Sequence, residues 1–254
     1  MSNKLDDPKE IQKFLVQLDN IEKLYRSHDK FRDEIYIDKG EVLCTSPNNI
    51  NSPYMIDCNI LDVTKTKEVY DFFINNSFAL DTKEYFEFRK NKKDKINLIE
   101  IEDNILTLKR TSGEIYSFDF INSKDIIEGN NKLKDNINNI FSEKELDYIE
   151  LDESDIERVK KVNEPFLLRM KDKVVIENDM YKALHEDSDE YKIYMLPKYI
   201  NKGIDFRKLK TKNVVSEVSV SLRKSEINKE LLLFIIKVKN ETLEIKQSFY
   251  TLNI

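Results

Sequence analysis

Apolar residues recur every three or four positions over residues 8–26, which predicts an amphipathic helix there. Its apolar face consists of Ile11, Phe14, Leu15, Leu18, Ile21 and Tyr25. Alternating patterns then predict strands at 34–46, with a turn at Asp38-Lys39-Gly40, and at 53–62. Residues 65–76 predict a second, short helix that buries Val69, Phe72 and Phe73, with Thr64 or Thr66 as its N-cap.

The same two-residue alternation continues over 84–90, 96–103, 105–111 and 114–121. Turn signals at Asp103-Asn104 and Ser112-Gly113 separate these runs, so we predict an antiparallel meander. Residues 122–147 then lose the periodicity, are polar and rich in Asn, and predict a connector with a short helix near 136–141.

The second half begins with a strand at 147–151 and a helix at 153–163, for which Ser154 and Glu157 form a candidate capping box. That helix buries Ile156, Val159 and Val162. Strands are predicted at 166–170, 173–179, 191–196, 214–222, 231–239 and 242–254. Polar loops are predicted at 182–190 and 198–213, and two helical turns at 223–230.

The order of elements therefore occurs twice. The turn at Lys39-Gly40 precedes Glu41-Val42-Leu43, and the turn at Lys171-Asp172 precedes Lys173-Val174-Val175, an offset of roughly 132 residues. We predict an α+β protein of two similar domains, residues 1–121 and 147–254, joined by a connector at 122–146. Each domain should be an antiparallel sheet with two helices on its inner face.

Composition narrows the function classes. The net charge of −6 argues against wholesale coating of nucleic acid but permits a local basic stripe. Only 4 Gly and 2 His residues speak against Gly-rich nucleotide loops and His-based catalysis or metal binding. Cys44 and Cys58 are too few for a disulfide framework, and the N-terminus shows no signal peptide, so we expect a reducing, cytoplasmic setting.

Cationic residues of the predicted helices are the candidate binding residues. Opposite the apolar face of the first helix lies an arc without acids, formed by Lys9, Gln12, Lys13, Val16, Asn20 and Lys23. Glu10, Asp19 and Glu22 lie on its flanks. The other helices offer Lys67, Arg158, Lys161, Arg223, Lys224 and Lys229. An ordinary solvated helix face is the competing explanation for any one of these helices.

This arrangement resembles the DNA sliding clamps, the processivity factors of replicative polymerases, and most closely the two-domain, trimer-forming clamps of T4-type phages. Residues 37–76 look like the family's hairpin, third strand and second helix, 152–179 like its helix, strand, turn and strand, and 218–238 like its closing strand, short helix and hydrophobic strand. The charged insert at 83–95 and the long connector depart from the family pattern.

The resemblance implies a homotrimeric ring that encircles duplex DNA without reading its sequence and tethers a DNA polymerase, with the helix cations facing DNA. A clamp loader would be a further partner. No catalytic residue, cofactor, metal or membrane is implied, and the location would be the host cell cytoplasm if the source is viral. A role as transcription coactivator would also fit the family.

The C-terminal apolar residues Phe249, Tyr250, Leu252 and Ile254 either complete the core or flank the family's docking pocket for hydrophobic peptide tails. Alternation sets Phe249 on the face opposite the other three. The basic run Arg89, Lys90, Lys92, Lys93 and Lys95 is interpreted as a charged hairpin tip or as a further contact surface for DNA or a partner.

Three other functions stay open. One is a clamp-fold viral transcription factor that does not slide. Another is a metal-dependent nuclease, for which the acidic loop 185–190, with Asp187 and Asp189, would supply carboxylates. A structural virion protein is the third.

Overall fold

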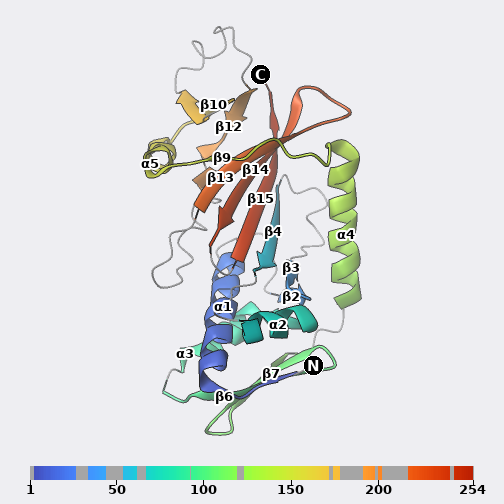
Figure 1. Cartoon of the computed structure of the whole chain (residues 1–254), viewed down its shortest axis with the longest axis vertical. Helices are drawn as coiled ribbons and strands as arrows, with labels where there is room; N and C mark the ends of the chain where they lie inside the picture. The colour runs from blue at the N-terminus through green and yellow to red at the C-terminus, as the bar shows by residue number, and fades with distance from the viewer. Residues whose placement is uncertain are drawn as a thin grey trace.

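The computed structural model describes residues 3–26, 34–43, 54–61, 67–91, 93–118, 123–171, 174–177, 191–197, 200–201, 217–240 and 243–253. These ranges contain both helices and antiparallel strands, so the predicted α+β class is confirmed. Figure 1 shows an elongated molecule with the N-terminal half at the bottom and the C-terminal half at the top.

The N-terminal half contains the helices α1 (Pro8–Arg26), α2 (Lys67–Asn75) and α3 (Thr82–Lys90). Its strands are β1 (Lys4–Leu5), β2 (Glu34–Asp38), β3 (Glu41–Leu43), β4 (Tyr54–Ile60), β5 (Ser77–Asp81), β6 (Ile96–Glu102), β7 (Ile105–Arg110) and β8 (Ile115–Phe118). The connector is the helix α4 (Ser123–Ile140).

Among the described residues, the C-terminal half contains one assigned helix, α5 (Glu153–Lys161). Its strands are β9 (Ile149–Glu150), β10 (Phe166–Met170), β11 (Val174–Glu177), β12 (Tyr191–Met195), β13 (Glu217–Lys224), β14 (Leu231–Lys239) and β15 (Leu243–Leu252). Pro197, Ile200 and Asn201 are also helical, and Ile200 is fully buried.

One eight-stranded sheet passes through both halves in the order β5-β2-β3-β4-β15-β14-β13-β9. The halves meet where β4 pairs with β15, from Ile60 opposite Leu243 to Tyr54 opposite Phe249. A four-stranded sheet, β1-β6-β7-β8, belongs to the N-terminal half, and a three-stranded sheet, β11-β10-β12, to the C-terminal half.

Strand order repeats between the halves. The order β1-β6-β7-β8 has the same connectivity as β9-β13-β14-β15, and β5-β2-β3 has the same connectivity as β12-β10-β11. The strand β4 follows β3 in the first half, and the segment that follows β11 in the second, 178–190, lies outside the described residues.

Tight turns follow the sequence signals. In the β2–β3 turn, Lys39 and Gly40 have φ of 48° and 89°, a region in which glycine is favoured. A Cβ on Gly40 would also stand 3.1 Å from the Ile74 side chain. Asp103 and Asn104, both with positive φ, make the two-residue turn between β6 and β7.

The two faces of the eight-stranded sheet have different partners. One face contributes Ile35, Ile37, Ile245 and Phe249 to the main core, which also takes the apolar sides of α1, α2, α3 and α5 and of the two smaller sheets. The opposite face is covered by α4, through Ile127 over the N-terminal half and Ile137 over the C-terminal half. In Figure 1, α5 lies to the left of this sheet and α4 to the right, and α1 lies below β15 and to the left of β2 and β3.

Two predictions about secondary structure in the first half and the connector are wrong. Residues 84–90 form helix α3 instead of a strand, because Asp81 caps the helix by accepting from the Glu84 N–H and because Tyr85 and Phe88 are buried one turn apart. The connector is an 18-residue helix instead of a mostly irregular segment. The buried or half-buried side chains of α4 recur at helical spacing, but two of them, Asn130 and Lys134, are polar. The apolar members are Ile127, Leu133 and Ile137, and Phe141 continues the stripe just after the helix.

Two predictions in the second half are also wrong. The N-cap of α5 is Asp152 instead of Ser154, and the Asp152 carboxylate accepts from the Asp155 N–H at 2.9 Å. Residues 223–230 form no helix, because β13 continues to Lys224 in register with Leu232 of β14. The candidate N-caps Thr64 and Thr66, the loop 182–190 and most of 198–213 lie outside the described residues.

In the described part of the chain, no helix combines the length and apolar character needed to cross a membrane.

Candidate nucleic-acid and partner interfaces

The exposed side of α1 carries the three predicted lysines. Lys9, Lys13 and Lys23 are exposed, together with Gln12 and Val16 of the same arc. The opposite side is fully packed: Phe14 is completely buried and stacks on Phe73 of α2, with ring centroids 4.7 Å apart. Substitution of these lysines therefore leaves the core of the N-terminal half untouched.

Asn20 was predicted in the lysine arc, and the structure corrects this. Its side chain is only 3% exposed. The solvent-facing strip is narrower than a helical projection implies, because α1 contacts α2, α3 and β6.

The acidic residues of α1 are withdrawn from solvent to different degrees. Glu22 is 3% exposed, and Asp19 accepts hydrogen bonds from Tyr85 and Arg89 of α3. Burial raises the pKa of Glu10, and the nearby carboxylates of Asp7 and Glu68 add to this shift. Of these acids Glu22 is buried, whereas Glu10 and Asp19 are half-exposed and Lys9, Lys13 and Lys23 are exposed.

The helices α2 and α5 present cations beside acids. Lys67 is exposed next to the exposed Glu68. On α5, Arg158 and Lys161 are exposed, and the Lys161 ammonium lies 3.9 Å from the Glu157 carboxylate. Such an exposed pair contributes little to stability and neutralises part of the local charge.

The three cations predicted on a fourth helix lie elsewhere. Arg223 is on the face of β13 that α4 covers, where its guanidinium donates to the carbonyls of Phe141 and Ser142 and to the Asn138 side chain. It thus satisfies carbonyl groups at the C-terminal end of α4. Lys224, at the end of β13, lies over the ring of Tyr191, and Lys229 is exposed in the turn before β14.

The basic run at the end of α3 and in the segment after it is not a hairpin tip. Arg89 binds Asp19 of α1, and Lys90 pairs with Glu87 on the same helix. Lys93 and Lys95 are exposed between α3 and β6, and Lys92 lies outside the described residues.

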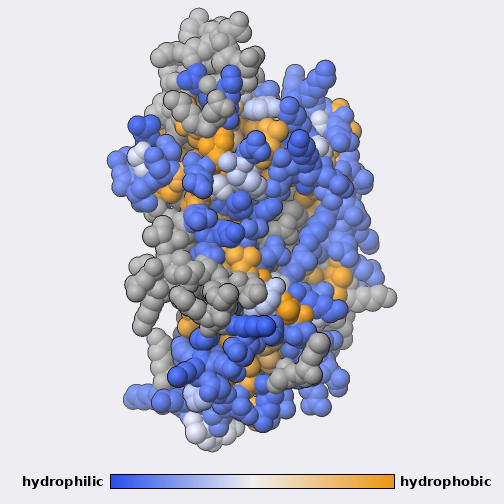
Figure 2. All heavy atoms as spheres, in the orientation of Figure 1, coloured by the Kyte–Doolittle hydropathy of each residue, from blue (hydrophilic) through white to orange (hydrophobic). Residues whose placement is uncertain are grey.

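An apolar surface is present where α4, the β13–β14 turn and β15 meet. We call it the terminal apolar patch, and it consists of Ile140, Ile227, Leu231, Tyr250 and Leu252. Ile227 is 71% exposed, Leu252 50% and Tyr250 37%. Leu231 pairs with Leu252 across the strands, and the Glu226 N–H donates to the Ile140 carbonyl. Figure 2 shows apolar residues reaching the surface beside the upper end of α4.

The C-terminal residues predicted for a docking pocket divide between two faces. Tyr250 and Leu252 belong to the terminal apolar patch. Phe249 points to the opposite face, is 2% exposed and packs against Phe234, with ring centroids 5.1 Å apart, so it completes the core. Ile254 lies outside the described residues. Sequence inspection missed Ile227, because it is a single apolar residue in the polar run 223–230.

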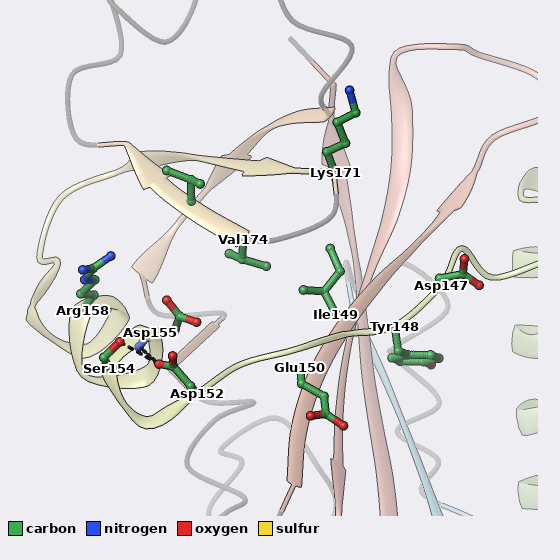
Figure 3. Close-up of a pocket in the computed structure, with 11 residues that line it drawn as sticks. Asp147, Tyr148, Ile149, Glu150, Asp152, Ser154, Asp155, Arg158, Lys171 and Val174 are labelled. Atoms are coloured by element: carbon green, nitrogen blue, oxygen red, sulfur yellow. Dashed lines mark hydrogen bonds between the residues drawn. The ribbon is translucent and has the colours of Figure 1, made fainter.

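A hollow of about 840 Å³ lies between β9, the start of α5 and β11 (Figure 3). Its charged lining residues are Asp147, Glu150, Asp152, Asp155, Arg158 and Lys171. Hydrogen bonds from the Asp155 N–H and the Ser154 hydroxyl lower the pKa of Asp152, which is occupied in capping the helix. Since carboxylates outnumber cations in this lining, the hollow does not suit a phosphate. The same carboxylates partly offset the positive charge of Arg158.

Within the described ranges, no three His, Cys, Asp or Glu side chains are grouped so that they could hold a metal ion. The acidic loop 185–190, with Asp187 and Asp189, lies outside those ranges, as does Cys44. Cys58 is in β4, opposite Val42 of β3 and Ile245 of β15.

No protein-family model matches this chain, and no match was found among curated proteins.

Proposed function

We propose that this protein is a DNA sliding clamp: a ring of identical chains that encircles duplex DNA and tethers a DNA polymerase to it. The observation that carries this proposal is the repeated strand order of the two halves, which share one sheet through the β4–β15 junction. A duplicated unit that joins its neighbour by sheet pairing has the connectivity from which a ring can be built.

The proposed ring closes by repeating the internal junction between copies. The strand β15 pairs with β4, and β8 is the counterpart of β15 in strand order. We expect β8 of one copy to add to the β11 side of the three-stranded sheet of the next. Such a head-to-tail contact uses two different surfaces, so it produces a closed ring when the rotation between copies permits. We expect three copies.

The DNA-facing surface in this proposal is centred on Lys9, Lys13 and Lys23. A sliding ring needs cations that neutralise phosphates without contacting base edges. Lys67, Arg158 and Lys161 are further contributors, each weakened by neighbouring acids. Arg223 is excluded because its guanidinium is bound to the end of α4 on the other face of the sheet.

The polymerase-docking surface in this proposal is the terminal apolar patch. It lies where connector and C-terminal strand meet, and its half-exposed side chains suit the apolar residues of a peptide tail.

A topological retention assay tests the proposal without a loader. The protein is incubated with linear duplex DNA carrying biotin at both ends, streptavidin is added to block the ends, and the salt concentration is then raised. We expect wild type to stay on end-blocked DNA and to leave open-ended DNA. Equal loss from both would show that the protein does not encircle DNA, as expected for a clamp-fold transcription factor that does not slide.

The surface assignment is tested by the triple variant K9E/K13E/K23E. Because each lost phosphate contact lowers the log–log salt slope by about 0.9, the variant should lose most of its association with duplex DNA while its fold and solution mass stay unchanged. The matched control is K132E/K144E/K239E, which makes the same charge change at exposed lysines on α4, the segment after it and the end of β14. Equal binding by wild type and the α1 variant would remove α1 from the DNA surface.

A further inference from the structure

Helix α3 pairs with Asp19, a half-exposed acid on α1 between Lys13 and Lys23. Asp19 accepts from Tyr85 Oη at 2.6 Å and from Arg89 Nε at 3.0 Å with one carboxylate oxygen, and from Arg89 Nη2 at 2.9 Å with the other. The Arg89 and Asp19 side chains are 24% and 28% exposed. A two-point guanidinium contact plus a phenol leaves this carboxylate little capacity for another cation.

The position of Asp19 on α1 explains why this contact matters. Asp19 precedes Lys23 by four residues, which is the spacing at which an acid and a lysine on one helix attract each other. With its carboxylate free, Asp19 would compete with DNA phosphates for the Lys23 ammonium. Arg89 offers the better partner, because its planar donors match both oxygens of a carboxylate.

The remaining acids of α1 are in different surroundings. Glu22 is buried, and Glu10 is half-buried among other carboxylates near the start of the helix. At Asp19, by contrast, a cation from another helix pairs with the acid.

We infer that α3 acts as a charge-masking element, in which Arg89 and Tyr85 occupy Asp19 and so keep Lys23 available for the phosphate backbone of duplex DNA. The inference rests on the proposed function, since it concerns the same DNA surface. Arg89 and Tyr85 are positioning residues: they act through Asp19 and Lys23 and need not contact DNA themselves.

The test compares R89Q, D19N and the double variant D19N/R89Q. The probe is a fluorescent 30-base-pair duplex, with binding followed by anisotropy between 50 and 200 mM salt and thermal unfolding measured in parallel. R89Q should reduce the salt dependence by the equivalent of one phosphate contact, so that its loss of affinity relative to wild type is about 3.5-fold larger at 50 mM than at 200 mM salt. D19N/R89Q should restore wild-type binding, because no carboxylate then competes for Lys23.

Restored DNA binding in D19N/R89Q distinguishes charge masking from a purely structural role of Arg89. If Arg89 only holds α3 in place, the double variant will remain as weak as R89Q, and binding will follow the loss of stability. If R89Q does not fold, R89K is used instead, since its ammonium keeps the charge but cannot grip both oxygens. Wild-type binding by R89K would overturn the inference.

The triple variant K9E/K13E/K23E keeps the two proposals distinct. If that variant loses DNA binding while R89Q binds as wild type, the masking inference is wrong and the DNA surface stands. If the triple variant also binds DNA as wild type, α1 is not the DNA-facing surface and the proposed placement of DNA is wrong.

Discussion

The rings of Phe141 and Tyr250 pack against each other, with centroids 5.4 Å apart and planes tilted by 30°. Phe141 follows the last turn of α4 and is fully buried, whereas Tyr250, on β15, is 37% exposed. This contact packs the segment after α4 against β15 beneath the terminal apolar patch. Tyr250 and Leu252 keep part of their surface in solvent on the outer side of this contact.

If the terminal apolar patch docks a polymerase as proposed, replacing Leu252 by Ser should weaken that binding about tenfold. The expected cause is the loss of about 1.4 kcal/mol of binding free energy from one apolar contact. Leu252 is 50% exposed, so the free energy of unfolding should change by less than about 1 kcal/mol. Surface plasmon resonance and urea denaturation give the two quantities. Val16→Ser, which changes an exposed apolar residue on α1, is the control and should bind as wild type.

A parallel loss of stability and binding in Leu252→Ser would mean that the residue only finishes the core. A point substitution is preferable to removing residues 250–254. Thr251 donates to the Tyr194 carbonyl and the Asn253 N–H to the Glu230 carbonyl, so truncation would also disturb the sheet.

Replacing Arg110 by Ala should destabilise the N-terminal half by about 3 kcal/mol. Its guanidinium is buried, donates to the carbonyls of Phe88, Asn91 and Asp94, and lies over the Phe88 ring. Loss of these donors releases the segment between α3 and β6. The neighbouring Lys109→Ala, which breaks a half-exposed pair with Glu100, should cost less than about 1 kcal/mol. Similar urea midpoints for the two variants would contradict the anchoring role.

Replacing Asp152 by Ala should lower the thermal midpoint more than replacing Ser154 does. The Asp152 carboxylate satisfies the Asp155 N–H at the start of α5, whereas the Ser154 hydroxyl only donates to that carboxylate. Differential scanning fluorimetry on both variants checks the order. The reverse order would favour the Ser154 capping box predicted from the sequence.

Stability should fall as the pH rises above about 10, where tyrosines of an unfolded chain ionise. Burial raises the pKa of Tyr85, with the Asp19 carboxylate adding to the effect, and burial also raises the pKa of Tyr116. Since the folded chain holds these protons more tightly than the unfolded chain, their contribution is fully present below pH 10 and is lost above it.

Urea midpoints at pH 8, 10 and 11 measure this alkaline loss. Tyr116→Phe should reduce the loss, because the phenylalanine keeps the contacts with Tyr85 and Phe88 but has no proton to release. A loss of the same size in the variant would show that Tyr116 is not among the groups responsible.

Much of this fold could be predicted from the sequence because the apolar period is unambiguous in long elements. The stripe of α1 and the alternation in β6 and β7 admit one interpretation each. The pattern around Tyr85, Phe86 and Phe88 fits two periods, and the capping by Asp81 together with the burial of Tyr85 and Phe88 decides for a helix. In α4 the stripe includes Asn130 and Lys134, so it was hidden by the polar composition; Lys134 faces the sheet because it pairs with Glu41 of β3.

The candidate surfaces were harder to predict, because exposure depends on which elements pack together. A projection of α1 identifies Lys9, Lys13 and Lys23 but cannot show that neighbouring elements enclose Asn20 or that Arg89 occupies Asp19. The segment 223–230 can form two helical turns by sequence, whereas pairing with Leu233 of β14 keeps Arg223 in a strand. The terminal apolar patch joins segments distant in sequence, and a local pattern does not reveal it.

The β4–β15 junction also has a consequence for the order of folding during synthesis. Residues 54–60 leave the ribosome long before residues 243–249, which are their pairing partners. Until β15 arrives, the β2-β3-β4 ribbon has an unpaired edge of backbone donors and acceptors. Contacts between such distant segments form slowly, because a long loop must close before pairing stabilises it. The nascent N-terminal half is therefore the stage most exposed to mispairing with another chain, and the C-terminal strand ends that exposure when it joins the sheet.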